Sequence, residues 1–78
     1  MRVKKPYVVI SFDTTTQAIA METQCRRLGI PGRLIPLPKE ISAACGLAWR
    51  MPREEYDEYR VQIDVLPVET GQHTTLLL

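Results

Sequence analysis

Alternating apolar and polar positions open the chain. Residues 7–12, Tyr-Val-Val-Ile-Ser-Phe, place Val8, Ile10 and Phe12 on one side of an extended segment. Because β-branched and aromatic residues favour strands, this pattern predicts a first strand that starts at residue 7. Residues 1–6 are rich in basic side chains and carry no such pattern. We expect them to form a frayed lead-in to the folded chain.

The next stretch has the periodicity and the end signals of a helix. Thr14 and Gln17 have the spacing of a capping box, and Gly29 followed by Pro31 is typical of a helix end. Apolar residues between these signals recur at i, i+3, i+7 and i+10, which forms a stripe along one helix face. The stripe consists of Ala18, Met21, Cys25 and Leu28. The sequence therefore predicts a helix that ends near Leu28, with Cys25 in the core rather than acting as a partner for another thiol.

Two further strands are expected in the middle of the chain. Residues 33–37 form the second, and because Pro36 and Pro38 cannot donate to a ladder it should lie at a sheet edge. Residues 39–44 are the connection. Residues 46–51 form the third strand, which ends at Pro52, with alternate apolar side chains on one face.

Residues 53–67 fit two patterns. As a helix, they align an apolar stripe made of Tyr56, Tyr59, Ile63 and Leu66. As a strand, they alternate strictly at Tyr59, Val61, Ile63 and Val65. A proline followed by acidic residues is a typical helix start, so the sequence favours the helix and leaves the strand as the alternative. Gly71 then marks a turn, and residues 74–78 are expected to form a last strand.

The helical alternative gives the order βαββαβ. This order predicts an α+β fold, a ferredoxin-like sandwich with helices on one face of an antiparallel sheet. A chain of 78 residues allows one domain, so residues 7–78 should form a single sandwich. If residues 59–66 were a strand instead, one sheet face would be bare. A second copy of the chain is then a possible cover, which makes a homo-oligomer an open alternative.

Charge and composition exclude several classes of partner. The chain is 45% hydrophobic and 24% charged, with a formal net charge of +1, so no overall field favours nucleic acid or anionic lipid. The apolar run from Tyr7 to Ile10 is too short for a signal peptide or a spanning helix. Cys25 and Cys45 form neither a disulfide framework nor a metal-ligand spacing, which favours a cytoplasmic protein without a metal. No glycine-rich phosphate loop is present, so no cofactor is expected.

The candidate chemistry centres on Cys45. Its sequence neighbours in Ser42–Gly46 are small, and Arg33, Lys39 and Arg50 lie close in sequence. Small neighbours and positive charge favour a reactive thiolate, so Cys45 is a candidate thiol acceptor and the three basic residues are candidate anion ligands. The alternative is that Cys45 is a small buried hydrophobe and that the charges are only solvated. The sequence leaves the exposure of Cys45 open. His73 has no acidic or nucleophilic partner nearby in sequence and is not expected to be a general base or a metal ligand.

Two motifs in the middle of the chain, Gly-Ile-Pro-Gly-Arg-Leu-Ile-Pro at 29–36 and Cys-Gly-Leu-Ala at 45–48, resemble a family of small bacterial selenium/sulfur carrier-like proteins. The resemblance covers about residues 7–51 and is most specific in these two motifs. The matching positions are Thr14-Thr15, Ala18, Met21-Glu22, 29–36, 38–42 and 45–48. The chain after Pro52, including the tail expected to form the fourth strand, departs from the family pattern.

The resemblance implies a carrier protein in which Cys45 accepts sulfur or selenium, with a donor or recipient protein as its partner. The alternative is a non-catalytic module that binds a protein or a ligand, in which Cys45 only packs. An independent enzyme is the weakest interpretation, because no base, acid or cofactor cradle accompanies the thiol.

Overall fold

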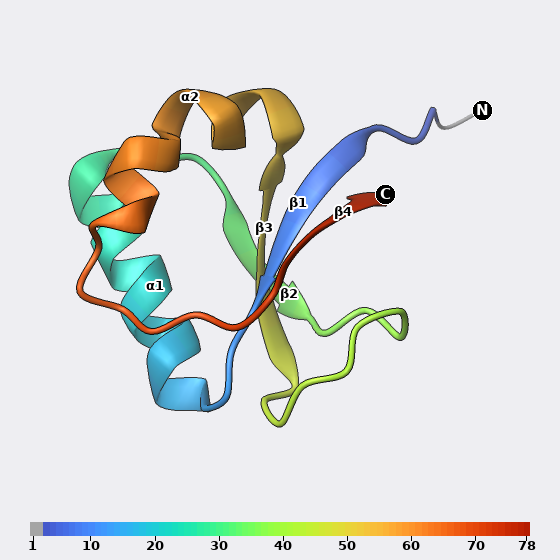
Figure 1. Ribbon diagram of the computed structural model, residues 1–78, viewed down its shortest axis with the longest axis horizontal. Coiled ribbons are helices and arrows are strands. Elements are labelled where there is room, and N and C mark those ends of the chain that lie inside the picture. Colours follow the sequence, from blue (N-terminus) through green and yellow to red (C-terminus); the bar gives the residue numbers. More distant parts are fainter. Residues whose placement is uncertain (1–2) are drawn as a thin grey trace.

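The computed structural model, which describes residues 3–78, has the predicted βαββαβ order (Figure 1). The elements are β1 (Pro6–Ser11), α1 (Thr15–Leu28), β2 (Arg33–Pro36), β3 (Leu47–Pro52), α2 (Arg53–Asp64) and β4 (His73–Leu77). Part of the expected frayed lead-in, residues 1–2, lies outside the described residues. Strand β1 begins one residue earlier than predicted, and Lys5 before it exchanges backbone hydrogen bonds of 3.1 and 2.9 Å with Leu78.

The strands form one antiparallel four-stranded sheet in the order β2-β3-β1-β4. The ferredoxin-like prediction is therefore confirmed. β2 lies at a sheet edge, as its prolines predicted. The register pairs Ile10 with Trp49 and Val9 with Arg50, so side chains of the central strands alternate between the two faces.

Helix α1 begins and ends as its sequence signals predict. The Thr14 side chain accepts from the Gln17 backbone N–H, and Gln17 in return caps the Thr14 backbone. Gly29 takes the left-handed conformation, with φ of 71°, that closes the helix. Cys25 is fully buried on the apolar stripe, as expected. Leu28 is not buried, because Ile30, which follows the turn, packs into the core at this end of the helix.

The ambiguous residues after Pro52 are helical, and the strand alternative is wrong. Ile63 is buried, and the other members of the predicted helical stripe pack against the same core. Val61 on α2 and Val65 just after it, which the strand pattern would have buried with Ile63, are solvent-exposed. The helical periodicity prevailed because it brings a continuous apolar stripe onto the sheet.

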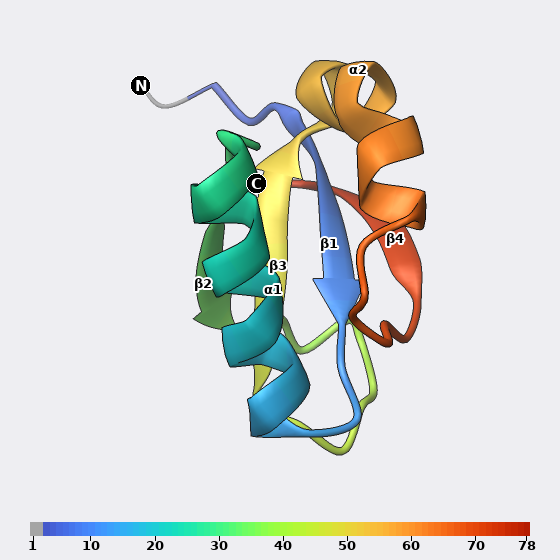
Figure 2. The same ribbon diagram turned by 90° about the vertical axis from the view of Figure 1, so that its left-hand side faces the viewer.

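Both helices lie on one face of the sheet, as Figure 2 shows, and the main core fills the space between these layers. We call the other side the open face. It carries a second, smaller apolar cluster of Val9, Ala48 and Ile41, with Ile41 coming from the connection between β2 and β3. The part of the connection that contains Leu37 and Ile41 thus folds back beneath the sheet, on the side away from the helices (Figure 1). Within residues 3–78, no helix has the length and apolar character needed to cross a membrane.

Candidate functional site

Cys45 lies two positions before the start of β3, against the junction of β1 and α1. Its backbone N–H donates to the carbonyl oxygen of Phe12 at 3.3 Å, which fixes the cysteine beside the turn that leads into α1. Its sulfur accepts a hydrogen bond from the Leu47 backbone N–H at 3.4 Å. The Thr15 hydroxyl, in the first turn of α1, lies 3.7 Å from the same sulfur. A residue far along the chain therefore completes the surroundings of the thiol.

The Cys45 sulfur does not lie open to solvent. Cys45 is only 4% exposed and belongs to the main core cluster. Its sequence neighbours are small, but the β1–α1 junction covers the side chain, and the sequence pattern gave no sign of this long-range contact. The sulfur nevertheless has polar neighbours, since it faces one backbone N–H, that of Leu47, and the first turn of α1.

Arg33 and Arg50 come together but not at the thiol. They are direct partners in the β2–β3 register and lie on the open face with Ile35 and Ala48. Cys45 packs into the core on the helix side. Lys39 is an exposed residue of the connection between β2 and β3. The structure therefore does not bring Arg33 and Arg50 to the sulfur, because the two-residue period of a strand puts Arg50 on the face opposite the core. The anion-binding role of the three cations stays a prediction.

Cys25 offers a different environment from Cys45. It is fully buried in the stripe of α1, and this burial raises the pKa of its thiol to about 11. Both cysteines are free thiols. A thiol with so high a pKa is almost entirely protonated at neutral pH, so Cys25 is poorly suited to nucleophilic chemistry.

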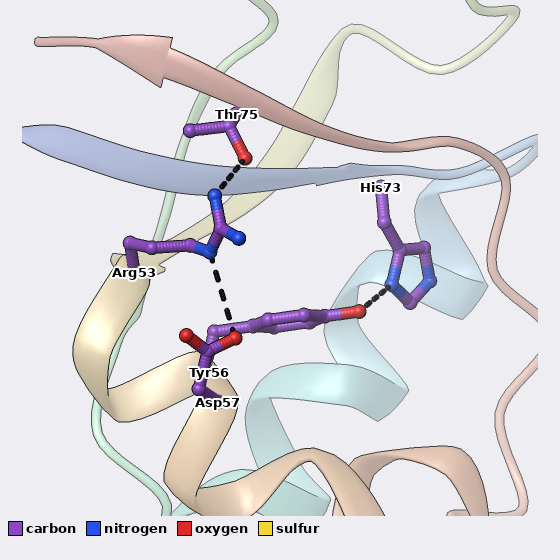
Figure 3. Close-up of polar contacts among 5 residues, drawn as sticks. All are labelled: Arg53, Tyr56, Asp57, His73 and Thr75. Atoms are coloured by element: carbon purple, nitrogen blue, oxygen red, sulfur yellow. Dashed lines mark hydrogen bonds and ion pairs between the residues drawn. The ribbon is translucent and has the colours of Figure 1, made fainter.

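His73 has partners that the sequence did not suggest. Its Nδ1 lies 2.8 Å from the Tyr56 hydroxyl, and its Nε2 lies 2.9 Å from the Thr70 hydroxyl. The two rings of Tyr56 and His73 meet edge to face, with centroids 5.8 Å apart (Figure 3). Partial burial of the ring lowers the pKa of His73, and the nearby Arg60 adds to the effect while Asp64 opposes it.

A pocket of about 260 Å³ adjoins His73 between α2 and β4. On its other side Arg53 donates to the Thr75 hydroxyl at 3.3 Å and pairs with Asp57 at 3.5 Å (Figure 3). The sequence signals for this cluster were Thr70 and Thr75, which lie within three positions of His73, whereas Arg53, Tyr56 and Asp57 come from the separate helix α2. Nowhere in residues 3–78 do three or more potential metal ligands gather.

Comparison with known proteins gives one match. Residues 7–70 match the family model described as "Putative Se/S carrier protein-like". The matched region runs from β1 through α2 and ends before β4. No curated protein and no solved structure matches the chain. The match includes Cys45 and both arginines of the open face.

Proposed function

This chain belongs to the family described as "Putative Se/S carrier protein-like", and we propose that it carries sulfur or selenium on the thiol of Cys45. The protein acts between a donor protein that supplies the atom and a recipient that takes it. The observation that carries the proposal is the position of the Cys45 sulfur, which faces the Leu47 N–H and the first turn of α1. Cys25, the other thiol, lacks such an environment.

The transfer step needs only a thiolate and a persulfide. The Cys45 thiolate attacks the terminal sulfur of a donor persulfide, R–S–SH. A new S–S bond forms on Cys45, the donor S–S bond breaks, and the donor leaves as its thiolate R–S⁻. Cys45 then holds the persulfide, and a recipient thiolate reverses the same exchange. No net oxidation occurs, so the carrier needs no cofactor for this step. If selenium replaces the terminal sulfur of the donor, the same exchange transfers it with the same bonds formed and broken.

Burial of Cys45 makes a movement part of the proposal. At 4% exposure the sulfur is out of reach of a donor protein, so residues 37–46 must leave the sheet for transfer to occur. Local openings of this kind occur well below the cost of global unfolding.

A persulfide-transfer assay tests the proposal. The full chain is incubated with a cysteine desulfurase and cysteine, and its intact mass is measured under non-reducing conditions. We expect a gain of about 32 Da, one sulfur atom, on the wild type and on Cys25→Ser, and no gain on Cys45→Ser. Cys25→Ser is the matched control, because it removes the other thiol of the chain. An equal gain in Cys45→Ser would overturn the proposal.

The burial of Cys45 also favours a second candidate function, a module that binds a protein or a ligand and uses Cys45 only for packing. Alkylation of the native protein near neutral pH separates the two. In a carrier, Cys45 reacts much faster than Cys25. In a packing module, both thiols react only at the rate of global unfolding.

A further inference from the structure

The arginine pair on the open face forms no ion pair among residues 3–78. Arg33 and Arg50 are directly opposite each other in the β2–β3 register, and like charges in this position destabilise a sheet. Ion pairs within residues 3–78 join other side chains, and no carboxylate of this part of the chain comes within pairing distance of either guanidinium. The fold thus maintains an unfavourable juxtaposition of two cations.

An aromatic ring fixes one of the two guanidinium groups. The central carbon of the Arg50 guanidinium lies 4.4 Å from the centroid of the Tyr7 ring, a cation–π contact. Tyr7 comes from β1, which pairs with β3, and both side chains are half-buried. This contact holds the charged head group in place without neutralising it, so its hydrogen-bond donors stay available to a ligand.

The two arginines line a pocket of about 340 Å³ together with Tyr7, Gly32 and Pro52. Gly32 has φ of 140°, and a Cβ at this position would lie 2.6 Å from the Trp49 ring and 2.7 Å from the Arg50 carbonyl oxygen. Only glycine therefore lets the chain pass this close to β3 at the pocket wall. Glu55 also lines the pocket and adds one acidic group at its α2 side.

We propose that this pocket binds a phosphate group, with Arg33 and Arg50 as its ligands. Guanidinium groups match the oxygens of a phosphate in pairs, and a phosphate monoester carries a charge between −1 and −2 that offsets the repulsion of two cations. The space suits a phosphate that is free or attached to a small molecule. The site lies on the face opposite Cys45, so it does not depend on the proposed role of the thiol.

A nuclear magnetic resonance titration of the full chain with inorganic phosphate, at constant ionic strength set by chloride, tests the site. We expect saturable shifts of the backbone amides of Gly32, Arg33 and Arg50. Arg33→Gln and Arg50→Gln should each weaken binding about tenfold or more, because each removes one guanidinium. Arg27→Gln, an exposed arginine of α1, is the matched control and should leave binding unchanged. Shifts that do not saturate, or that spread equally over all basic residues, would overturn the proposal.

Thermal unfolding provides a second test, because the stability of Arg33→Gln relative to the wild type should differ with and without phosphate. Without phosphate, Arg33→Gln should be at least as stable as the wild type, since the variant relieves the repulsion of like charges. With phosphate, the wild type should gain stability and the variant should not. A parallel titration with glycerol 3-phosphate identifies the source: tighter binding than inorganic phosphate indicates a phosphomonoester, and equal binding indicates the phosphate group alone. A variant that phosphate stabilises as much as the wild type would contradict the assignment.

Discussion

Residues 37–46, which we call the cover because Leu37 and Ile41 close the open face of the sheet, also include Cys45, so their release from the sheet should control the reactivity of this thiol. Opening the cover must break the hydrogen bond from Cys45 to Phe12 and unpack Ile41, which is 6% exposed beneath the sheet. The bond contributes about 1 kcal/mol and the burial of an isoleucine about 2–3 kcal/mol. An opening cost of about 3–4 kcal/mol slows alkylation about 10²–10³-fold relative to a free thiol, at about 1.4 kcal/mol per factor of ten.

The sharpest perturbation is Ile41→Val. Removing one buried methyl group destabilises a packed site by about 1 kcal/mol, and here the loss falls on the closed state of the cover. We therefore expect Cys45 to be alkylated about fivefold faster than in the wild type. The assay is reaction of the native protein with iodoacetamide, sampled over time, with each thiol quantified by mass spectrometry of its peptide.

Ile63→Val is the matched control. Ile63 is 5% exposed, as buried as Ile41, but it belongs to α2 on the helix side of the sheet. Ile63 shares the main core with Cys45, but its truncation leaves the packing of Ile41 on the open face intact. Global stability should fall by a similar amount, so Cys25 should react faster and Cys45 at an unchanged rate. Equal acceleration of Cys45 in both variants would show that the sulfur is reached only by global unfolding. No acceleration in Ile41→Val would show that Ile41 does not hold the cover closed. Either result refutes the reasoning.

Two further predictions concern stability. Gly32→Ala should lower the free energy of unfolding by about 1–3 kcal/mol, because a Cβ at Gly32 meets the Trp49 ring and the Arg50 carbonyl and the residue keeps φ of 140°. Urea unfolding measures this loss, and an unchanged midpoint would contradict it. His73 should make stability fall as pH drops below its ordinary pKa of 6.5, since its pKa is lowered in the folded protein and the unfolded chain binds the proton more readily. The loss levels off below the lowered folded pKa. Unfolding midpoints between about pH 8 and about pH 5 should therefore vary less in His73→Gln than in the wild type, and identical pH profiles would exclude this role.

Local signals made much of the fold predictable. The capping box of Thr14 and Gln17 and the left-handed Gly29 determine the ends of α1 within a few residues of sequence. Because these contacts join residues that are close in sequence, the local spacing of residue types predicts them. The second helix was harder, since local preferences at Val61 and Ile63 supported both alternatives. Burial decided it, because only the helical stripe meets the sheet continuously.

The surroundings of Cys45 could not be predicted in this way. The thiol is covered by Thr15 and by the end of β1, about thirty positions away, and the sequence contains no signal for that contact. The packing of Ile41 on the open face also depends on contacts between residues that are far apart in sequence. Ile41 is one apolar residue in a short connection, and only the return of the chain beneath the sheet makes it a core residue. Contacts of long sequence separation depend on topology rather than on local pattern.

The placement of the arginines, in contrast, follows from the alternation of side chains along a strand, which closeness in sequence does not reveal. Arg50 and Trp49 are adjacent in the chain, yet a strand directs them to opposite faces, and the Trp49 side belongs to the core that holds Cys45. A four-stranded sheet therefore stands between the two guanidinium groups and the sulfur. The polar neighbours of the sulfur are therefore local, namely the Leu47 N–H and the Thr15 hydroxyl in the first turn of α1. Nearness in sequence suggested one site with four members. The alternation of the strand divides it into a thiol on the helix side and a cationic pair on the open face, and each can be tested while the other is left intact.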